Sequence, residues 1–200
     1  TAEQDWPLLT TGLAGRLRHD SMAQWLDFVD HPFVHGVADG TLAVAAFRNF
    51  LIQDYLYLIQ YARACALLVH KSDTLAGMRH AAGLLSGILD TELSMHVGYC
   101  RQWGIGEAAL EQAEESIELL AYSRFILDRA QTGDMLDLLV TLAPCLIGYA
   151  EVGARLHASP RTLREGNPYW SWIALYGGDD YTALVEDGVR RLDAVGAAYG

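Results

Sequence analysis

An aspartate inside a long apolar helical pattern constrains this chain more than any other feature of its sequence. From Leu42 to about His70 apolar residues recur at helical spacing, and Asp54 stands among them. Tyr57 and Tyr61 follow three and seven residues later, on the same face of the predicted helix. A carboxylate on such a face needs a partner, because burying a bare charge is costly. Asp54 is therefore either a core residue bonded to another helix or a residue that holds a polar ligand between aromatic walls.

Glycine, proline and capping residues divide the rest of the chain into further predicted helices. A compact turn from His31 to Thr41 precedes the long helix, and Asp39 and Thr41 are expected to cap it. Ser72-Asp73 and Asp134 are expected to cap two later helices. No segment alternates like a strand over a useful length. Helices are predicted at 11–30, about 72–103, 116–131, 134–157, 169–176 and 179–198, with an acidic, solvated stretch at 107–115. This pattern predicts an all-α bundle in a single domain, with sites that face inward.

Composition excludes several classes of protein. The chain carries 25 acidic and 14 basic residues, a net charge of −11, which argues against a nucleic-acid surface. The longest apolar run of note, Leu138 to Ala150, is too short to span a bilayer. Three cysteines without metal-ligand spacing cannot form a closed set of disulfides, so we expect a reducing, cytoplasmic location.

A second informative stretch is the predicted helix 134–157, which contains Pro144 and directly after it Cys145. Proline deep in a helix removes a backbone donor and is expected to kink it, which would open a pocket wall. Cys145 is then either an inert buried thiol or a nucleophile. Cys65 and Cys100 lack such a context and are expected in the core.

Two strings in this order resemble the signatures of the TenA family, the thiaminase II or aminopyrimidine aminohydrolase group, in its cysteine-containing type. The first is HPFVHGVADGTL followed by FRNFLIQDYLY, and the second is PCLIGYAEVG. The resemblance implies an all-α, haem-oxygenase-like fold, a homotetramer, and hydrolysis of a C–N bond on a small pyrimidine in thiamin salvage without a metal or organic cofactor. It makes Cys145 the nucleophile and Asp54 the residue that binds the ring. It also implies a substrate pocket shaped by four tyrosines, Tyr57, Tyr122, Tyr149 and Tyr176.

Glu92 and His96 are four residues apart on a predicted helix, a spacing that can place two ligands on one metal, with Glu151 as a third. The related di-iron proteins of this fold also need a late helix rich in histidine, and residues 169–176 contain none. We therefore expect no metal site, and expect Glu92, His96 and Glu151 to tie helices together through hydrogen bonds.

The resemblance also implies a catalytic glutamate on a helix beyond residue 200, so no residue of this sequence receives that role. A chain of this length is expected to bind the pyrimidine and to hydrolyse it slowly. Two alternatives stay open: a non-catalytic pyrimidine-binding or regulatory protein, and a metal-dependent oxidase on the same fold.

Overall fold

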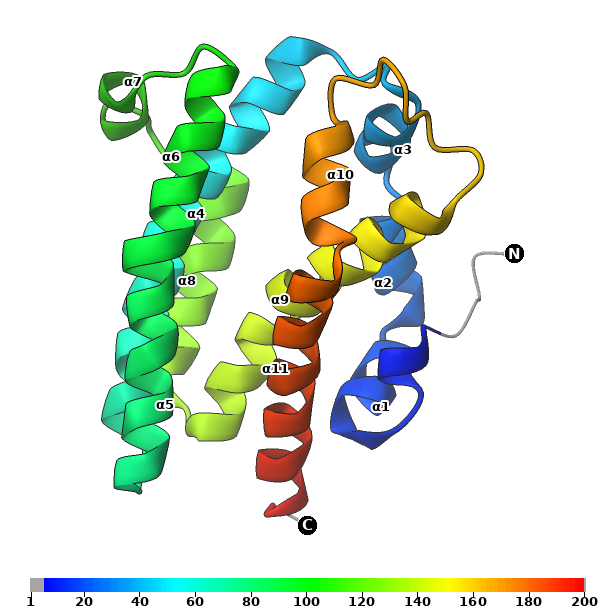
Figure 1. The fold of residues 1–200 in the computed structure, drawn as a ribbon. Helices are drawn as coiled ribbons and strands as arrows, with labels where there is room; N and C mark the ends of the chain where they lie inside the picture. Colours follow the sequence, from blue (N-terminus) through cyan, green and yellow to red (C-terminus); the bar gives the residue numbers. More distant parts are fainter. Residues whose placement is uncertain (1–5, 200) are drawn as a thin grey trace. The chain divides into compact units, whose positions relative to one another are not determined.

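Helices account for all the regular structure in residues 6–199, the part of the chain that the computed structural model describes (Figure 1). The prediction of an all-α protein is therefore confirmed. In chain order the elements are η1 Pro7–Leu9, α1 Gly12–Asp20, α2 Met22–Val29, α3 Pro32–Asp39, α4 Val44–Lys71, α5 Leu75–Ser86, η2 Gly87–Glu92, α6 Leu93–Gln102, α7 Glu107–Glu111, α8 Ile117–Thr132, α9 Met135–Ala158, α10 Trp170–Tyr176 and α11 Asp179–Ala197.

The chain forms two compact units, which we describe one at a time. The central unit is Val44–Thr141, and the terminal unit takes in Thr1–Ala43 and Leu142–Gly200. The prediction of a single domain stays a prediction.

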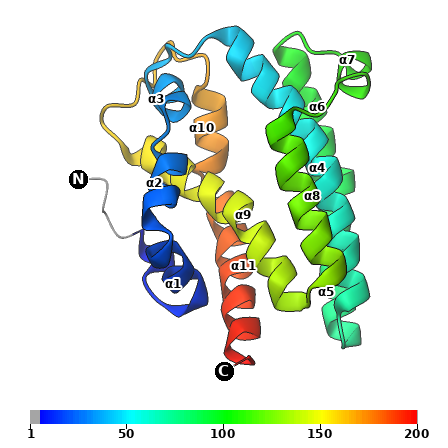
Figure 2. The same ribbon diagram turned by 180° about the vertical axis from the view of Figure 1, so that it is seen from behind.

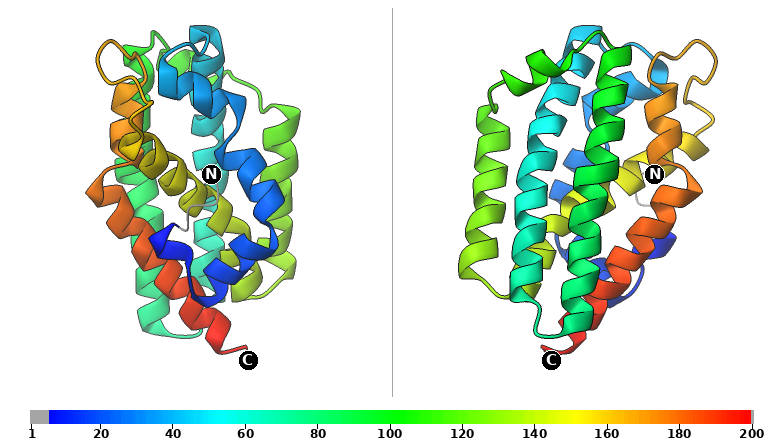
Figure 3. Two further views of the ribbon diagram at one scale, coloured as in Figure 1. Left: turned by 90° about the vertical axis from the view of Figure 1, so that its right-hand side faces the viewer. Right: turned by 60° about the vertical axis from the view of Figure 1, so that its left-hand side comes forward.

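The central unit is built around α4, the 28-residue helix predicted from the apolar pattern. Its neighbours α5, α6 and α8 pack along it, as the right-hand view of Figure 3 shows. Phe47, Leu51 and Leu68 of α4 are almost fully buried. The segment predicted as one helix at 72–103 is a continuous helical run in which η2 is a π-helix between α5 and α6. Such π turns are rare and often occur at functional sites.

Helix caps in the central unit agree with the sequence at one position and differ at another. Asp134 and Asp137 accept hydrogen bonds from each other's backbone N–H at 2.9 Å, so Asp134 caps the start of α9 as predicted. At α5 the cap is Thr74, whose hydroxyl accepts from the Gly77 N–H at 3.0 Å. The prediction of Ser72-Asp73 is wrong, because the Ser72 hydroxyl donates back to the Leu68 carbonyl instead.

In the terminal unit α1 packs against α11 and α2, and α10 packs against α11 (Figure 2). The helix predicted at 11–30 is divided at Ser21 into α1 and α2.

The predicted acidic stretch at 107–115, in the central unit, contains a short helix, α7, whose Leu110 is buried.

The stretch from His31 to Thr41, predicted as a turn, contains the helix α3. Pro32 occupies the first helical position, His31 Nδ1 accepts from the Phe33 N–H at 3.1 Å, and Gly40 ends the helix at φ 76°. The Asp39 carboxylate accepts from both the N–H and the hydroxyl of Thr41. Asp39 and Thr41 therefore bond to each other in the turn after α3 instead of capping α4.

Asn167 fastens the loop before α10 to the end of α3. Its amide donates to the carbonyls of Val37, Ala38 and Leu163, and its Oδ1 accepts from the Tyr169 N–H at 2.9 Å. Because a single buried side chain bonds to all these backbone groups, the loop fixes the orientation of α10 within the terminal unit.

One helix in the described residues, α9, is long and apolar enough by composition to cross a membrane. Core helices meet the same criterion, and 44% of its apolar window is buried. Glu151, in the same helix, is fully buried and paired with Arg18, which fits a core helix better than a lipid-facing one.

Candidate active site

The residues predicted for the site fall into two sets, one in each unit. Asp54, Tyr57 and Tyr122 belong to the central unit, while the terminal unit holds three further candidates, Cys145, Tyr149 and Tyr176. Each set is built from its own unit below.

In the central unit Asp54 lies on α4, with its side chain only 9% exposed. His96 reaches it from α6, and its Nδ1 is 3.6 Å from Asp54 Oδ2. The other ring nitrogen, Nε2, is 2.8 Å from the carbonyl oxygen of Leu51, one turn before Asp54. This carboxylate therefore has a basic partner from a second helix, as the apolar surroundings require.

Glu92 shares the surroundings of this pair. Burial raises the pKa of the Glu92 carboxyl, the charge of Asp54 raises it further, and His96 lowers it. Two neighbouring carboxylates disfavour each other's ionisation, so the Glu92 carboxyl holds its proton to a higher pH than an ordinary glutamate does.

Two of the predicted tyrosines, Tyr57 on α4 and Tyr122 on α8, pack against each other. Tyr57 is buried on α4, and its ring stacks on that of Tyr122 from α8, with centroids 5.7 Å apart and planes 10° from parallel. The Tyr122 hydroxyl donates to the Thr141 carbonyl at 3.0 Å, which fixes the ring. Stacked rings of this kind form a flat apolar wall that suits an aromatic heterocycle.

In the terminal unit Cys145 is a half-buried thiol on α9, one residue after Pro144. The other two cysteines, Cys65 and Cys100, are buried in the central unit. Burial raises the pKa of the Cys65 thiol to about 12 and that of Cys100 to about 11, and a nearby acidic charge adds to each shift. Because the thiolate is the nucleophilic form, neither of these two suits nucleophilic catalysis.

Tyr149 and Tyr176 are brought together by α9 and α10. Their ring centroids are 5.0 Å apart, and Trp172 packs against both, at 6.0 Å from Tyr149 and 4.8 Å from Tyr176. Tyr181 meets Tyr176 edge-on at 4.9 Å. Trp172 and Tyr181 were not predicted from the sequence, although the aromatic segment 169–176 is the signal that could have pointed to Trp172.

Gly153 allows the end of α10 to approach α9. A Cβ atom at Gly153 would lie 2.3 Å from the carbonyl carbon of Tyr176, a distance that no side chain permits. The last glycine of the PCLIGYAEVG string is therefore required by close packing within the terminal unit.

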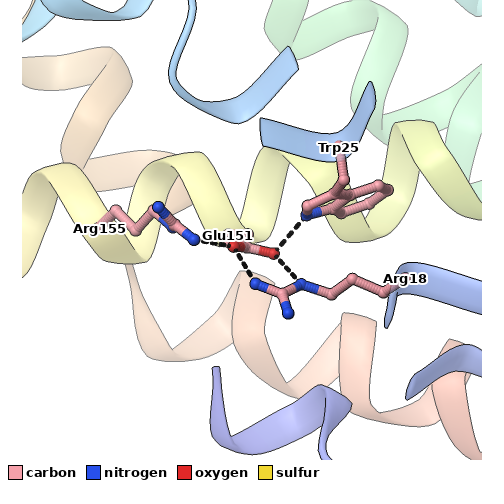
Figure 4. A network of polar contacts seen from close by, with 4 residues as sticks. All are labelled: Arg18, Trp25, Glu151 and Arg155. Carbon is pink, nitrogen blue, oxygen red and sulfur yellow. Dashed lines mark hydrogen bonds and ion pairs between the residues drawn. The ribbon is translucent and has the colours of Figure 1, made fainter. Parts of the chain in front are cut away.

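Glu151, the acid of the same string, has a structural role (Figure 4). Its carboxylate accepts two hydrogen bonds from the Arg18 guanidinium, at 2.7 and 2.9 Å, one from the Trp25 indole at 2.7 Å, and one from Arg155. Burial would raise the pKa of this carboxyl, but the bonds from Arg18 and Trp25 and the two guanidinium charges outweigh it and lower the pKa. The predicted tie of Glu151 to Glu92 and His96 is replaced by this network, and nothing in the sequence pointed to Arg18 or Trp25.

Between 6 and 199 no three His, Cys, Asp or Glu side chains are grouped as a metal site requires.

The comparisons with known proteins agree with one another. A family model described as TENA/THI-4/PQQC family matches residues 19–199. A protein of Halalkalibacterium halodurans named aminopyrimidine aminohydrolase is 36% identical over 181 residues, which are 90% of this chain and 80% of that protein. A putative hydroxymethylpyrimidine/phosphomethylpyrimidine kinase of Schizosaccharomyces pombe is 37% identical over 86% of this chain, which spans only 31% of that longer protein.

Solved structures give the same result for the fold. The crystal structure of a protein described as a TenA family transcription regulator, from Silicibacter sp. TM1040, superposes with a TM-score of 0.85 at 40% identity, covering 90% of this chain and 79% of the other. This similarity confirms the predicted haem-oxygenase-like helical fold.

Proposed function

Because the chain belongs to the TENA/THI-4/PQQC family, we propose that it is an aminopyrimidine aminohydrolase of the cysteine-containing type. Its substrate is 4-amino-5-aminomethyl-2-methylpyrimidine and, less efficiently, thiamin. Water replaces the amine on the side-chain methylene, and the product is 4-amino-5-hydroxymethyl-2-methylpyrimidine. Relatives named for the same chemistry, at 30–36% identity, support a hydrolase that acts on C–N bonds.

The observation that carries the proposal is the half-buried Cys145 after Pro144 on α9, in contrast to the two deeply buried cysteines. In the proposed reaction the Cys145 thiolate adds to the electron-poor ring, and the amine leaves from the methylene as ammonia. Water then adds at the methylene, and the thiolate departs from the ring. Atoms balance, since one water enters and one ammonia leaves.

Asp54 is proposed to bind the ring nitrogen and the exocyclic amine, which favours a protonated ring that accepts the thiolate. The low exposure of its carboxylate strengthens a charge-assisted bond to such a ring. Two tyrosine pairs are proposed to bind the substrate, since each ring is already held by its partner. They are Tyr57 with Tyr122 in the central unit and Tyr149 with Tyr176 in the terminal unit.

The experiment compares Cys145→Ala with Cys65→Ala and Cys100→Ala. We expect Cys145→Ala to keep its melting temperature and lose nearly all hydrolysis of the aminomethylpyrimidine, while the other two lose stability and keep turnover per folded molecule. Wild-type turnover by Cys145→Ala would refute the covalent mechanism. Proteolysis and mass spectrometry of wild-type protein stopped during turnover should find the pyrimidine on the Cys145 peptide.

One neighbour's description as a transcription regulator favours a second candidate, a non-catalytic pyrimidine-binding protein. The net charge of −11 argues against direct contact with DNA. Binding of the aminomethylpyrimidine without release of ammonia would favour this candidate. If a chelator removed a stoichiometric metal and abolished activity at the same time, the metal-dependent oxidase would be favoured instead.

Two further properties belong to the same proposal. A cytoplasmic location suits the three thiols, which a reducing compartment preserves. A homotetramer is expected from the resemblance, and sedimentation velocity of the purified protein measures it directly.

A further inference from the structure

His96 is held in a way that determines which of its ring nitrogens carries hydrogen. Nε2 lies 2.8 Å from the Leu51 carbonyl oxygen, which can only accept a hydrogen bond. Nε2 must therefore be the N–H donor of this bond. The ring is then fixed on α4 at one end, and its Nδ1 is the atom that faces Asp54.

The contact between Nδ1 and Asp54 Oδ2, at 3.6 Å, is longer than a hydrogen bond. Both side chains are only 9% exposed, so the electrostatic interaction between them is weakly screened by solvent. Hydrogen bonds in active sites are often long in the ligand-free protein and shorten when the ligand binds. A carboxylate offers about four lone-pair sites, so the imidazole and a bound ring can share it.

The π-helix adds a second, independent observation. η2 ends at Glu92, and His96 lies one turn later in α6, so the irregular turn contains one of the two residues that share surroundings with Asp54 and precedes the other by one turn. An irregular turn at that point changes which residues of the α5–α6 run point toward α4.

We propose that His96 is a positioning residue that orients the Asp54 carboxylate toward the bound pyrimidine ring. This inference rests on the proposed function for its ligand, although the contact itself can be tested without any ligand. His96 acts through Asp54, so its removal changes affinity for the ring only while Asp54 is present.

Two substitutions separate this role from a merely structural one. The amide of Gln reaches the Nε2 position, so His96→Gln keeps the tie to Leu51 and loses the group that faces Asp54. The amide of Asn overlies the Nδ1 position, so His96→Asn keeps a polar group that faces Asp54 and loses the tie to Leu51. A structural role predicts that His96→Asn is the more damaging change, and the positioning role predicts the opposite for ligand affinity.

The affinity test uses the product, 4-amino-5-hydroxymethyl-2-methylpyrimidine, because it binds without further reaction. By calorimetry we expect His96→Gln and Asp54→Asn each to weaken Kd by about tenfold, and His96→Asn by less than about threefold. The double variant Asp54→Asn/His96→Gln should also be about tenfold weaker, because the two residues act as one unit. His70→Gln, an exposed histidine at the end of α4, is the control and should bind as wild type. Wild-type affinity in His96→Gln, or a hundredfold loss in the double variant, would overturn the inference.

The ligand-free test is nitrogen NMR of the histidine side chains. We expect the His96 Nε2 to carry hydrogen, and the Nδ1 resonance alone to shift in Asp54→Asn. A wild-type protein that binds no pyrimidine would refute the proposed function, and the NMR result would then decide the His96–Asp54 contact separately. An Nδ1 resonance unchanged in Asp54→Asn would overturn the inference in either case.

Discussion

Replacing Glu151 by Gln should destabilise the protein far more than any surface charge change. The Glu151 carboxylate is 0% exposed, and its main partner Arg18 is 6% exposed, so the substitution leaves a buried guanidinium without its counter-charge. Breaking a buried pair from one side costs about 3–5 kcal/mol. For a chain of this size each kcal/mol lowers the melting temperature by about 2–4 °C, which gives a loss of roughly 6–20 °C.

The matched control is the pair of Glu186 and Arg190 on α11, in the same unit. These side chains are 44% and 67% exposed, and exposed pairs contribute about 0–1 kcal/mol. Glu186→Gln should therefore melt within a few degrees of wild type. Thermal unfolding followed by circular dichroism compares the three proteins, and an unchanged melting temperature in Glu151→Gln would refute the reasoning.

Acid should remove the difference between wild type and Glu151→Gln. The pKa of the Glu151 carboxyl is lowered in the folded protein below its ordinary value of 4.5. Its stabilising contribution is thus fully present above that value and is lost as pH falls through the folded pKa. The gap in unfolding free energy between the two proteins should stay constant from pH 7 to about 5 and narrow below that.

Three further predictions concern single residues. Iodoacetamide at pH 8 should label Cys145 in the folded protein and leave Cys65 and Cys100 unlabelled, because burial raises the pKa of those two thiols, and peptide mass spectrometry reads this directly. Gly153→Ala should lower the free energy of unfolding, measured in urea, by about 1–3 kcal/mol, since the new Cβ would clash with the Tyr176 backbone. Gly83→Ala, on an open face of α5, should instead raise it by about 0.5–1 kcal/mol, and equal effects of the two would contradict the packing argument.

Long-period patterns and local caps were the parts of this fold that the sequence revealed best. α4 follows from its apolar spacing, and the start of α9 follows from Asp134, because each depends on residues within one or two turns. The same local reasoning failed at α3, where Pro32 at the first helical position and Gly40 at the end describe a short helix as well as they describe a turn. Eight residues are too few for periodicity to decide between the two.

The partners of the two buried acids show why the candidate site was only partly predictable. Asp54 was recognised as an acid in apolar surroundings that needs a partner, since this depends only on near neighbours in the chain. Glu151 was expected to form hydrogen bonds between helices, but with Glu92 and His96. Arg18 is 133 residues from Glu151, and His96 is separated from the Leu51 carbonyl by 45 residues. Those pairings depend on how helices cross and, for His96, on a π turn for which residues 87–92 carry no sequence signal. Each residue in a helix turns the side-chain direction by about 100°, so an irregular turn alters which residues of the following helix face a neighbour. A prediction that assumes a regular helix through 72–103 can place Glu92 and His96 on one face, but it cannot assign that face to Asp54.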